Sequence, residues 1–201
     1  YNTHLYCTSY IYYKYNIYMK LYEFNNINLL NWITAFVIFE IPLALFFIRI
    51  SKNKKNSTVI NWYSGKNISI FNVLIQDAAY AFCGIIIALN LFKYLVSLNI
   101  IKSSFIIFII LLLFIQLLGD IIFSIIIKNW PKKYSTYWID YFKKYIKKSS
   151  FNALIGDSIW ITSWAITYYI VATYLKSFDI KIFLISLFLF LASAYSVKKS
   201  L

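Results

Sequence analysis

Residues 104–127 read "SFIIFIILLLFIQLLGDIIFSIII", and this stretch decides the fold class of the chain. Isoleucine, leucine and phenylalanine fill most of its positions, and Asp120 is its one charged residue. A helix of about 20 apolar residues is long enough to cross a lipid bilayer. The stretch therefore predicts a transmembrane helix.

Four other stretches are similarly apolar. They lie at residues 29–50, 72–97, 153–175 and 181–197. Together with the central stretch they predict an all-α integral membrane protein with five transmembrane helices, in which residues 19–201 form a single polytopic domain. Hydrophobic residues make up 61% of the chain and charged residues 13%, which is outside the range of soluble domains.

The first 18 residues have neither a clear apolar period nor the layout of a signal peptide. The only methionine is Met19. We expect translation to begin there, with residues 1–18 as upstream sequence. The alternative is a disordered, tyrosine-rich tail that belongs to the protein.

A start at Met19 would leave His4 and Cys7 outside the protein and Cys83 as its one cysteine. A disulfide framework, a His/Cys zinc site and a nucleophile paired with histidine are then excluded. The sequence also has no glycine-rich phosphate loop. We therefore expect no enzymatic activity, no metal and no cofactor.

Basic residues predict the orientation of the five spans, because short cytoplasmic loops are rich in Lys and Arg. The first connection and its flank carry five basic residues, the third carries seven, and the C-terminal tail carries Lys198 and Lys199. The second and fourth connections carry two lysines each. This alternation predicts an outside or lumenal N-terminus and a cytoplasmic C-terminus. It also explains the net charge of +13 without nucleic acid as a partner.

The third connection contains "YWIDYFKKYIKKSS", residues 137–150, with apolar residues at helical spacing. This pattern predicts a basic amphipathic helix lying on the cytoplasmic membrane surface, where it would favour anionic lipids. Four lysines are the candidate lipid contacts: Lys143, Lys144, Lys147 and Lys148. A connector helix packed on the bundle is an equally good interpretation, and the two are compatible.

An internal repeat relates "FNVLIQDAAY" (71–80) to "FNALIGDSIW" (151–160). Eight residues are identical over the 25 from 71 to 95 at an offset of 80. The similarity predicts a parallel tandem repeat of a helical hairpin, formed by spans 2–3 and spans 4–5. Such repeats occur in transporters and also in proteins without a transport role.

The repeat places Asp77 and Asp157 at equivalent depths, and Asp120 falls in the same cytoplasmic half of the membrane. Gln116 shares a helix face with Asp120. Glu40 lies near the middle of the first span, two residues before Pro42, where we expect a kink. Ionisable residues at such depths mark functional sites or paired polar contacts, so these five side chains form the candidate polar intramembrane site.

Three interpretations of these acids remain open. Asp77 and Asp157 can be anchors in the first turns of their helices, stabilised by the helix dipole or by lysines such as Lys66 or Lys147. The acids can instead form a site for a proton, a cation or a small substrate. Finally, they can face a partner subunit. Gly119 and Gly156, just before two of the aspartates, would admit a neighbouring helix.

Four motifs in this chain carry a resemblance: Gln116-x3-Asp120, "WPK" (130–132), "IDYFKKY" (139–145) and "NALIGDS" (152–158). Over residues 72–175 they resemble uncharacterised multi-pass membrane proteins of large DNA viruses that infect algae and protists. That pattern has an acidic residue and a glycine before Asn-Ala, where this chain has "KSSF" (148–151). The resemblance implies a viral or infected-cell membrane and assigns no catalytic residue.

The sequence thus predicts a structural or assembly protein of a viral or host internal membrane. The alternative is a small transporter or channel that uses the intramembrane carboxylates. "LIGD" and "LLGD" resemble the Gly-Asp motif of intramembrane aspartyl proteases, but the Tyr-Asp partner motif is absent. The expected partners are the bilayer, including anionic lipids, and membrane subunits or further copies of the chain.

Overall fold

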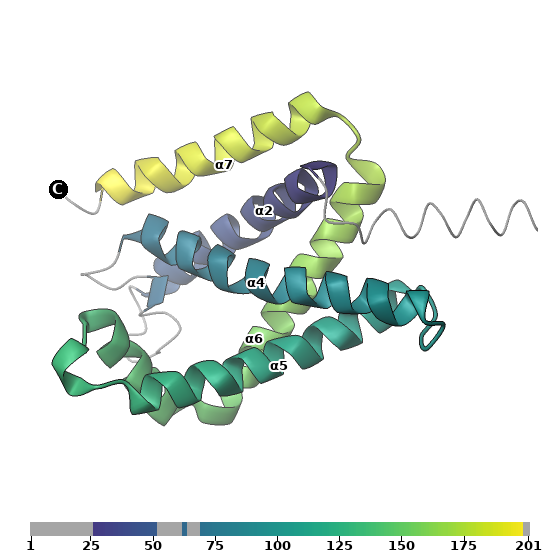
Figure 1. The fold of residues 1–201 in the computed structure, drawn as a ribbon. Coiled ribbons are helices and arrows are strands. Elements are labelled where there is room, and N and C mark those ends of the chain that lie inside the picture. The colour runs from purple at the N-terminus through teal and green to yellow at the C-terminus, as the bar shows by residue number, and fades with distance from the viewer. Residues whose placement is uncertain (1–25, 52–61, 64–68, 199–201) are drawn as a thin grey trace, which may run out of the picture.

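Helices form all the regular structure in residues 26–51, 62–63 and 69–198, which are the parts of the chain that the computed structural model describes. The main elements are α2 (Asn26–Ser51), α4 (Ile70–Ser97), α5 (Phe105–Asn129), α6 (Tyr137–Tyr174) and α7 (Phe178–Lys198), with a short 3-10 helix, η1 (Lys132–Tyr134), before α6 (Figure 1). The all-α prediction is confirmed for these ranges. Residues 1–18, with His4 and Cys7, lie outside them.

Three helices are long and apolar enough to cross a membrane: Asn26–Ile50, Ile70–Ser97 and Phe105–Asn129. They coincide with the first three predicted spans. α6 and α7 are not among the helices that meet this criterion in the described part of the chain. In α6, serine, threonine, tyrosine and tryptophan interrupt the aliphatic residues, which lowers its hydropathy.

α6 differs from the prediction of a connector helix followed by a separate span. It is one continuous helix of 38 residues. The side chain of Thr136 caps its start by accepting a hydrogen bond from the backbone N–H of Ile139 at 3.4 Å. No glycine or proline occurs between residues 132 and 155, so nothing in that stretch breaks the helix.

The helices are arranged with α2 beside α7 and with α4 and α5 as an antiparallel pair below them (Figure 1). α6 runs obliquely across this arrangement and contacts both α2 and α5. The end of α2, the start of α4 and the ends of α5 and α7 lie on the left in Figure 1. The α4–α5 and α6–α7 connections lie on the right.

The α4–α5 connection is a tight turn. Asn99 has a positive φ of 57° there, a conformation that asparagine tolerates better than most residues. The backbone N–H of Ile100 donates to the carbonyl of Leu95 at 3.0 Å, which closes the end of α4. This turn brings the two helices back against each other.

The predicted hairpin repeat is not confirmed by the packing. α4 packs against α5, but α7 packs mainly against α2, with a smaller contact to α4, instead of returning along α6. Similar sequences in α4 and α6 therefore enter different helix pairs. α2 continues as a helix through Pro42, which lies on its exposed surface.

The core lies between α2, α6 and α4 and is rich in aromatic rings. The ring of Trp32 stacks on that of Tyr168 with centroids 3.9 Å apart, and the Trp164 indole donates to the Trp32 carbonyl at 3.1 Å. Buried alanines, such as Ala35, Ala44 and Ala165, allow the helix backbones to approach closely. α2 is thus held by α6, and also by α7, both of which are far from it in sequence.

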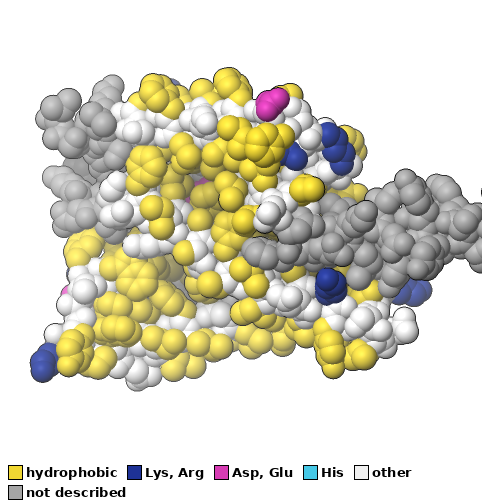
Figure 2. Space-filling view, turned by 45° about the horizontal axis from the view of Figure 1, so that its top comes forward, with side chains coloured by type: hydrophobic (Ala, Val, Ile, Leu, Met, Phe, Trp, Pro, Cys, Tyr) yellow, Lys and Arg dark blue, Asp and Glu magenta, His cyan; other side chains and the backbone are white. Residues whose placement is uncertain are grey.

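α5 is the most peripheral of the three apolar helices. Only 17% of its apolar window is buried, compared with 44% for α2. Its exposed face carries large apolar side chains along its whole length: Ile106, Ile110, Phe114, Leu117, Leu118, Ile121, Ile122, Ile125 and Ile126. Figure 2 shows the same character on another face, where hydrophobic side chains cover the middle and Lys and Arg lie toward the ends. Such a surface suits lipid rather than water.

Candidate functional site: carboxylates held by aromatic donors

Glu40 is completely buried, and both of its carboxylate oxygens accept hydrogen bonds. The Tyr63 hydroxyl donates to Oε1 at 2.6 Å, and the Trp160 indole donates to Oε2 at 2.5 Å. One donor follows Glu40 in the chain by 23 residues, and the other comes from α6, 120 residues away from Glu40. Glu40 therefore joins three separate parts of the fold.

Tyr63 is suited to act as a donor. It is 6% exposed, and its ring stacks on that of Phe47 with centroids 5.6 Å apart. Burial raises the pKa of its phenol well above the ordinary value, and the neighbouring Glu40 carboxylate raises it further. The hydroxyl consequently stays protonated at neutral pH and can donate to Glu40.

A tryptophan donor reaches both oxygens of Asp77. The Trp62 indole lies 3.2 Å from Oδ1 and 3.2 Å from Oδ2. Trp62 is held in turn by rings of α6, with centroid separations of 5.3 Å to Tyr141 and 5.0 Å to Phe142. The adjacent Gln76 accepts a hydrogen bond from the Trp138 indole, so α4 is linked to α6 here as well.

Asp120 is bound through one oxygen only. The Tyr80 hydroxyl donates to Oδ1 at 2.6 Å, and the Gln116 amide donates to the same atom at 2.9 Å. The other oxygen, Oδ2, is buried and has no hydrogen-bond partner within the described part of the chain. A Cβ on Gly119 would lie 3.0 Å from the Tyr80 hydroxyl oxygen, so this glycine gives the tyrosine its room.

Asp157 is the least constrained of the four acids. It is partly buried and makes no hydrogen bond to any residue that the structure describes. It interacts electrostatically with Asp120 and Asp77, which places all three aspartates in one region. No atom of the described residues would lie within 4 Å of a Cβ on the nearby Gly156. A neighbouring helix was expected to approach Gly119 and Gly156 closely. Among the described residues, a side chain lies beside Gly119 instead, and no atom lies beside Gly156.

The interpretation of Asp157 as an anchor at a helix start is wrong. α6 begins at Tyr137, so Asp157 lies in the helix interior and far from any N-terminal dipole. Asp77 is seven residues into α4, beyond its first turn. The electrostatic partners found for the four acids include no lysine or arginine of the described ranges. The proposed partner Lys66 lies outside those ranges.

The sequence analysis identified the acids but missed their donors. Trp62, Tyr63, Tyr80 and Trp160 supply the hydrogen bonds that lysines were expected to supply. A signal existed, because the chain holds 6 tryptophans and 19 tyrosines, and a buried indole or phenol needs an acceptor. Trp160 even stands within the repeated segment that drew attention to Asp157.

The four candidate lipid-contact lysines lie on the first half of α6. Lys144, Lys147 and Lys148 are exposed, whereas Lys143 is partly buried and donates to the Trp130 carbonyl at 2.9 Å. The apolar side of the same segment faces the protein, as Ile139 is 5% exposed and Trp138 and Phe142 pack against the core. This segment accordingly packs on the bundle instead of inserting its apolar face into lipid.

The fold and the site together define a helical protein with apolar helices suited to a membrane and with internal carboxylates bound by aromatic donors. The described residues contain no group of three or more His, Cys, Asp or Glu side chains arranged to hold a metal ion. Comparison with protein-family models, curated proteins and solved structures finds no match to this chain.

Proposed function

We propose that this chain is a multi-pass membrane protein with a structural or assembly role and without enzymatic activity. The observation that carries the proposal is the environment of Glu40, whose two oxygens are both occupied by donors from other parts of the fold. A buried acid with this arrangement links helices together and has no free oxygen for a ligand. The site is therefore best explained as part of a rigid scaffold.

Five membrane spans are part of this proposal. α2, α4 and α5 supply three, and the second half of α6 with α7 supplies the others. At about 1.5 Å per residue the 21 residues of α7 extend for roughly 31 Å, close to the thickness of a bilayer core. The distribution of basic residues supports an outside or lumenal N-terminus and a cytoplasmic C-terminus.

A viral or host internal membrane is the proposed location, supported by the resemblance of residues 72–175 alone. Assembly requires a surface for other subunits or further copies of the chain. The exposed apolar face of α5 is the widest such surface on the three apolar helices. Where no other subunit or further copy is bound, lipid tails cover this face of α5.

Cysteine labelling in native membranes tests the five-span arrangement. Asn99→Cys, Lys132→Cys and Ser177→Cys would each be placed in a background with Cys7→Ser and Cys83→Ser and treated with a membrane-impermeant maleimide. We expect Asn99→Cys and Ser177→Cys to react from outside, and Lys132→Cys to react only after permeabilisation. Labelling of Lys132→Cys and Ser177→Cys from the same side would exclude α6 as a span.

A small transporter or channel is the second candidate function. It is favoured by one observation. Within the described part of the chain, one oxygen of Asp120 has no hydrogen-bond partner, and neither has Asp157, which interacts with Asp120 electrostatically. Such a pair of carboxylates suits a proton, a cation or a small solute.

Flux measurements separate the two functions. The full chain would be reconstituted into liposomes and its proton, sodium and potassium fluxes compared with those of protein-free liposomes. A scaffold gives no additional flux. Flux that Asp157→Asn abolishes, and that the exposed control Asp179→Asn leaves unchanged, would replace the structural proposal with transport.

A further inference from the structure

One corner of the molecule combines strong positive charge with exposed aromatic rings. We call residues 128–148 the basic hook; it comprises the end of α5, η1 and about the first third of α6. It contains seven lysines and a single acid, Asp140. The Asp140 carboxylate accepts a hydrogen bond from the Ser135 hydroxyl at 2.6 Å, so it is engaged within the hook.

Hydrogen bonds hold the hook in one shape. The Trp130 indole donates to the Tyr134 carbonyl at 3.0 Å, and the Lys143 amine donates to the Trp130 carbonyl at 2.9 Å. The backbone N–H of Ser135 donates to the carbonyl of Lys132 at 3.1 Å. Lys128, Lys132 and Lys133 are therefore presented from an ordered backbone, which lowers the entropic cost of binding a partner.

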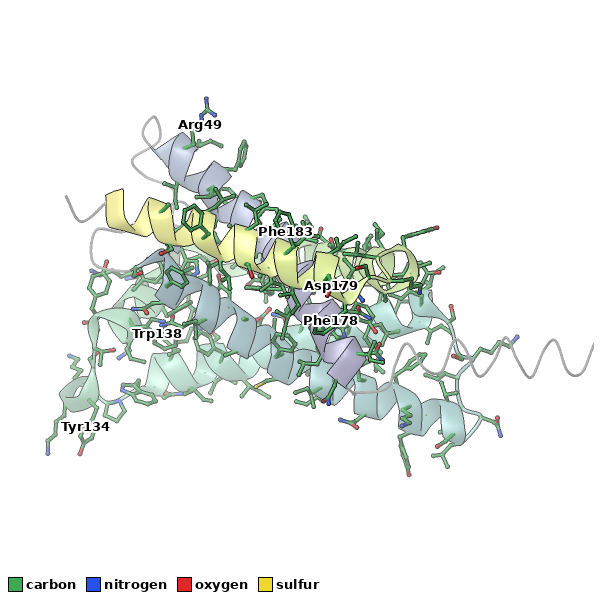
Figure 3. The ribbon with its side chains drawn as sticks, turned by 90° about the horizontal axis from the view of Figure 1, so that it is seen from above. Arg49, Tyr134, Trp138, Phe178, Asp179 and Phe183 are labelled. Carbon is green, nitrogen blue, oxygen red and sulfur yellow. The ribbon has the colours of Figure 1, made fainter. Side chains whose placement is uncertain are left out.

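The aromatic rings of the hook divide into two groups. Trp138 and Phe142 face inward, with centroid distances of 5.8 Å and 5.1 Å to Phe123 of α5. Tyr134 and Tyr137 are 62% and 52% exposed. Figure 3 shows Tyr134 at the edge of the molecule, pointing away from the helices, with Trp138 closer to them. Exposed tyrosines beside lysines are typical of the headgroup level of a membrane.

We propose that the basic hook binds the anionic phospholipid headgroups of the cytoplasmic leaflet, chiefly through Lys128, Lys132 and Lys133. This inference rests on the proposed membrane-spanning arrangement, which puts the hook at the cytoplasmic surface. The lipid contact is made by a rigid corner of lysines and exposed tyrosines, and the amphipathic helix does not insert its apolar side. Lys143 to Lys148 extend the same charged surface along α6.

If the lysines of the hook only set the orientation of the spans, the assembled protein would show no preference among lipids. Selectivity for anionic lipids therefore distinguishes lipid binding by the hook from a role in topology alone. The full chain would be reconstituted into phosphatidylcholine bilayers with spin-labelled phosphatidylserine or spin-labelled phosphatidylcholine. The fraction of motionally restricted label gives the relative association constant of each lipid.

The hook variant would be Lys128→Gln, Lys132→Gln and Lys133→Gln together. We expect it to lower the relative association constant for phosphatidylserine about tenfold or more, since each lysine at a membrane surface contributes roughly a factor of five. The charge-preserving variant with arginine at the same three positions is expected to retain the selectivity, and high salt is expected to reduce it.

A matched control carries Lys93→Gln, Lys102→Gln and Lys176→Gln, three exposed lysines at the opposite end of the helices. It is expected to keep the wild-type selectivity. Equal selectivity in the hook variant and the wild type, or no preference of the wild type for phosphatidylserine, would overturn the inference. Failure of the wild type to enter bilayers would instead overturn the membrane-spanning arrangement itself, and maleimide labelling of the reconstituted protein distinguishes this outcome.

Discussion

Glu40 and Asp157 are both carboxylates within long helices, yet their surroundings differ in every respect. Glu40 is fully buried and accepts two hydrogen bonds, whereas Asp157 is partly buried and accepts none from the described residues. α2 is enclosed by other elements at Glu40, while the surface of α6 is open beside Asp157 at Gly156. The role of an acid in an apolar helix thus depends on its hydrogen-bond donors. An acid with donors from other parts of the fold stabilises the fold, whereas one without such donors remains available to a ligand.

The largest effect is expected from Glu40→Ala. It removes the acceptor that Glu40 provides to the buried Tyr63 hydroxyl and to the partly buried Trp160 indole, at a cost of about 1–3 kcal/mol for each group. For a chain of this size a total loss of about 3 kcal/mol lowers the melting temperature by roughly 6–12 °C. Thermal unfolding in detergent, followed by tryptophan fluorescence, measures the change.

Asp179→Ala serves as the control for Glu40→Ala, because Asp179 is exposed in the first turn of α7. Its loss should cost less than about 1 kcal/mol, the usual contribution of an acid at a helix start. Equal melting temperatures for the two variants would show that Glu40 does not hold α2, α6 and Tyr63 together.

A smaller difference is expected between Asp77→Asn and Asp157→Asn. Asparagine at 77 keeps one acceptor for the Trp62 indole but loses the charge and the second oxygen, which should cost about 1 kcal/mol. Asparagine at 157 breaks no hydrogen bond and should change the free energy of unfolding by less than about 0.5 kcal/mol. Chemical or thermal unfolding of both variants measures the contrast, and a larger loss at 157 would show that Asp157 has a stabilising partner.

The smallest effects come from the two glycines. Gly156→Ala should stabilise α6 by about 0.5–1 kcal/mol, since its Cβ meets no other atom and alanine favours the helix. Gly119→Ala gives the same helix preference but forces the Tyr80 hydroxyl to move, and we expect it to be about 1 kcal/mol less stable than Gly156→Ala.

Tyr80→Phe provides the control for the glycine pair, because it removes the oxygen that a Cβ at position 119 would meet. In that background Gly119→Ala should no longer be penalised relative to Gly156→Ala. Unfolding temperatures of the four combinations give the coupling between positions 80 and 119. An unchanged penalty would mean that another contact limits the space at Gly119.

Long apolar runs predicted the helices of this protein well, and the intramembrane acids were found from the cost of placing them in lipid. Helix partners were harder to predict, because α7 is apolar on most of its surface and no polar stripe marks the side that packs on α2. The continuity of α6 was missed because its basic first part was interpreted as a separate helix in the connection before the fourth span, although no residue there breaks the helix.

The donors of the acids were missed for a different reason. Trp160 and Glu40 are 120 residues apart, and no local pattern connects them. Only the crossing of α6 over α2 brings the indole to the carboxylate. The sequence analysis gave no polar role to tryptophans and tyrosines near the apolar segments, whereas several of them carry the polar contacts of the site.

The separation between Glu40 and its two donors has a consequence for biosynthesis. At about 5–20 residues per second, Tyr63 leaves the ribosome roughly 1–5 s after Glu40, whereas Trp160 follows Glu40 by roughly 6–24 s. For much of the synthesis of the chain, Glu40 in α2 therefore has only one of its two hydrogen-bond donors. Tyr63 serves as its early partner, and the arrival of Trp160 completes the contact as one of the last events of folding.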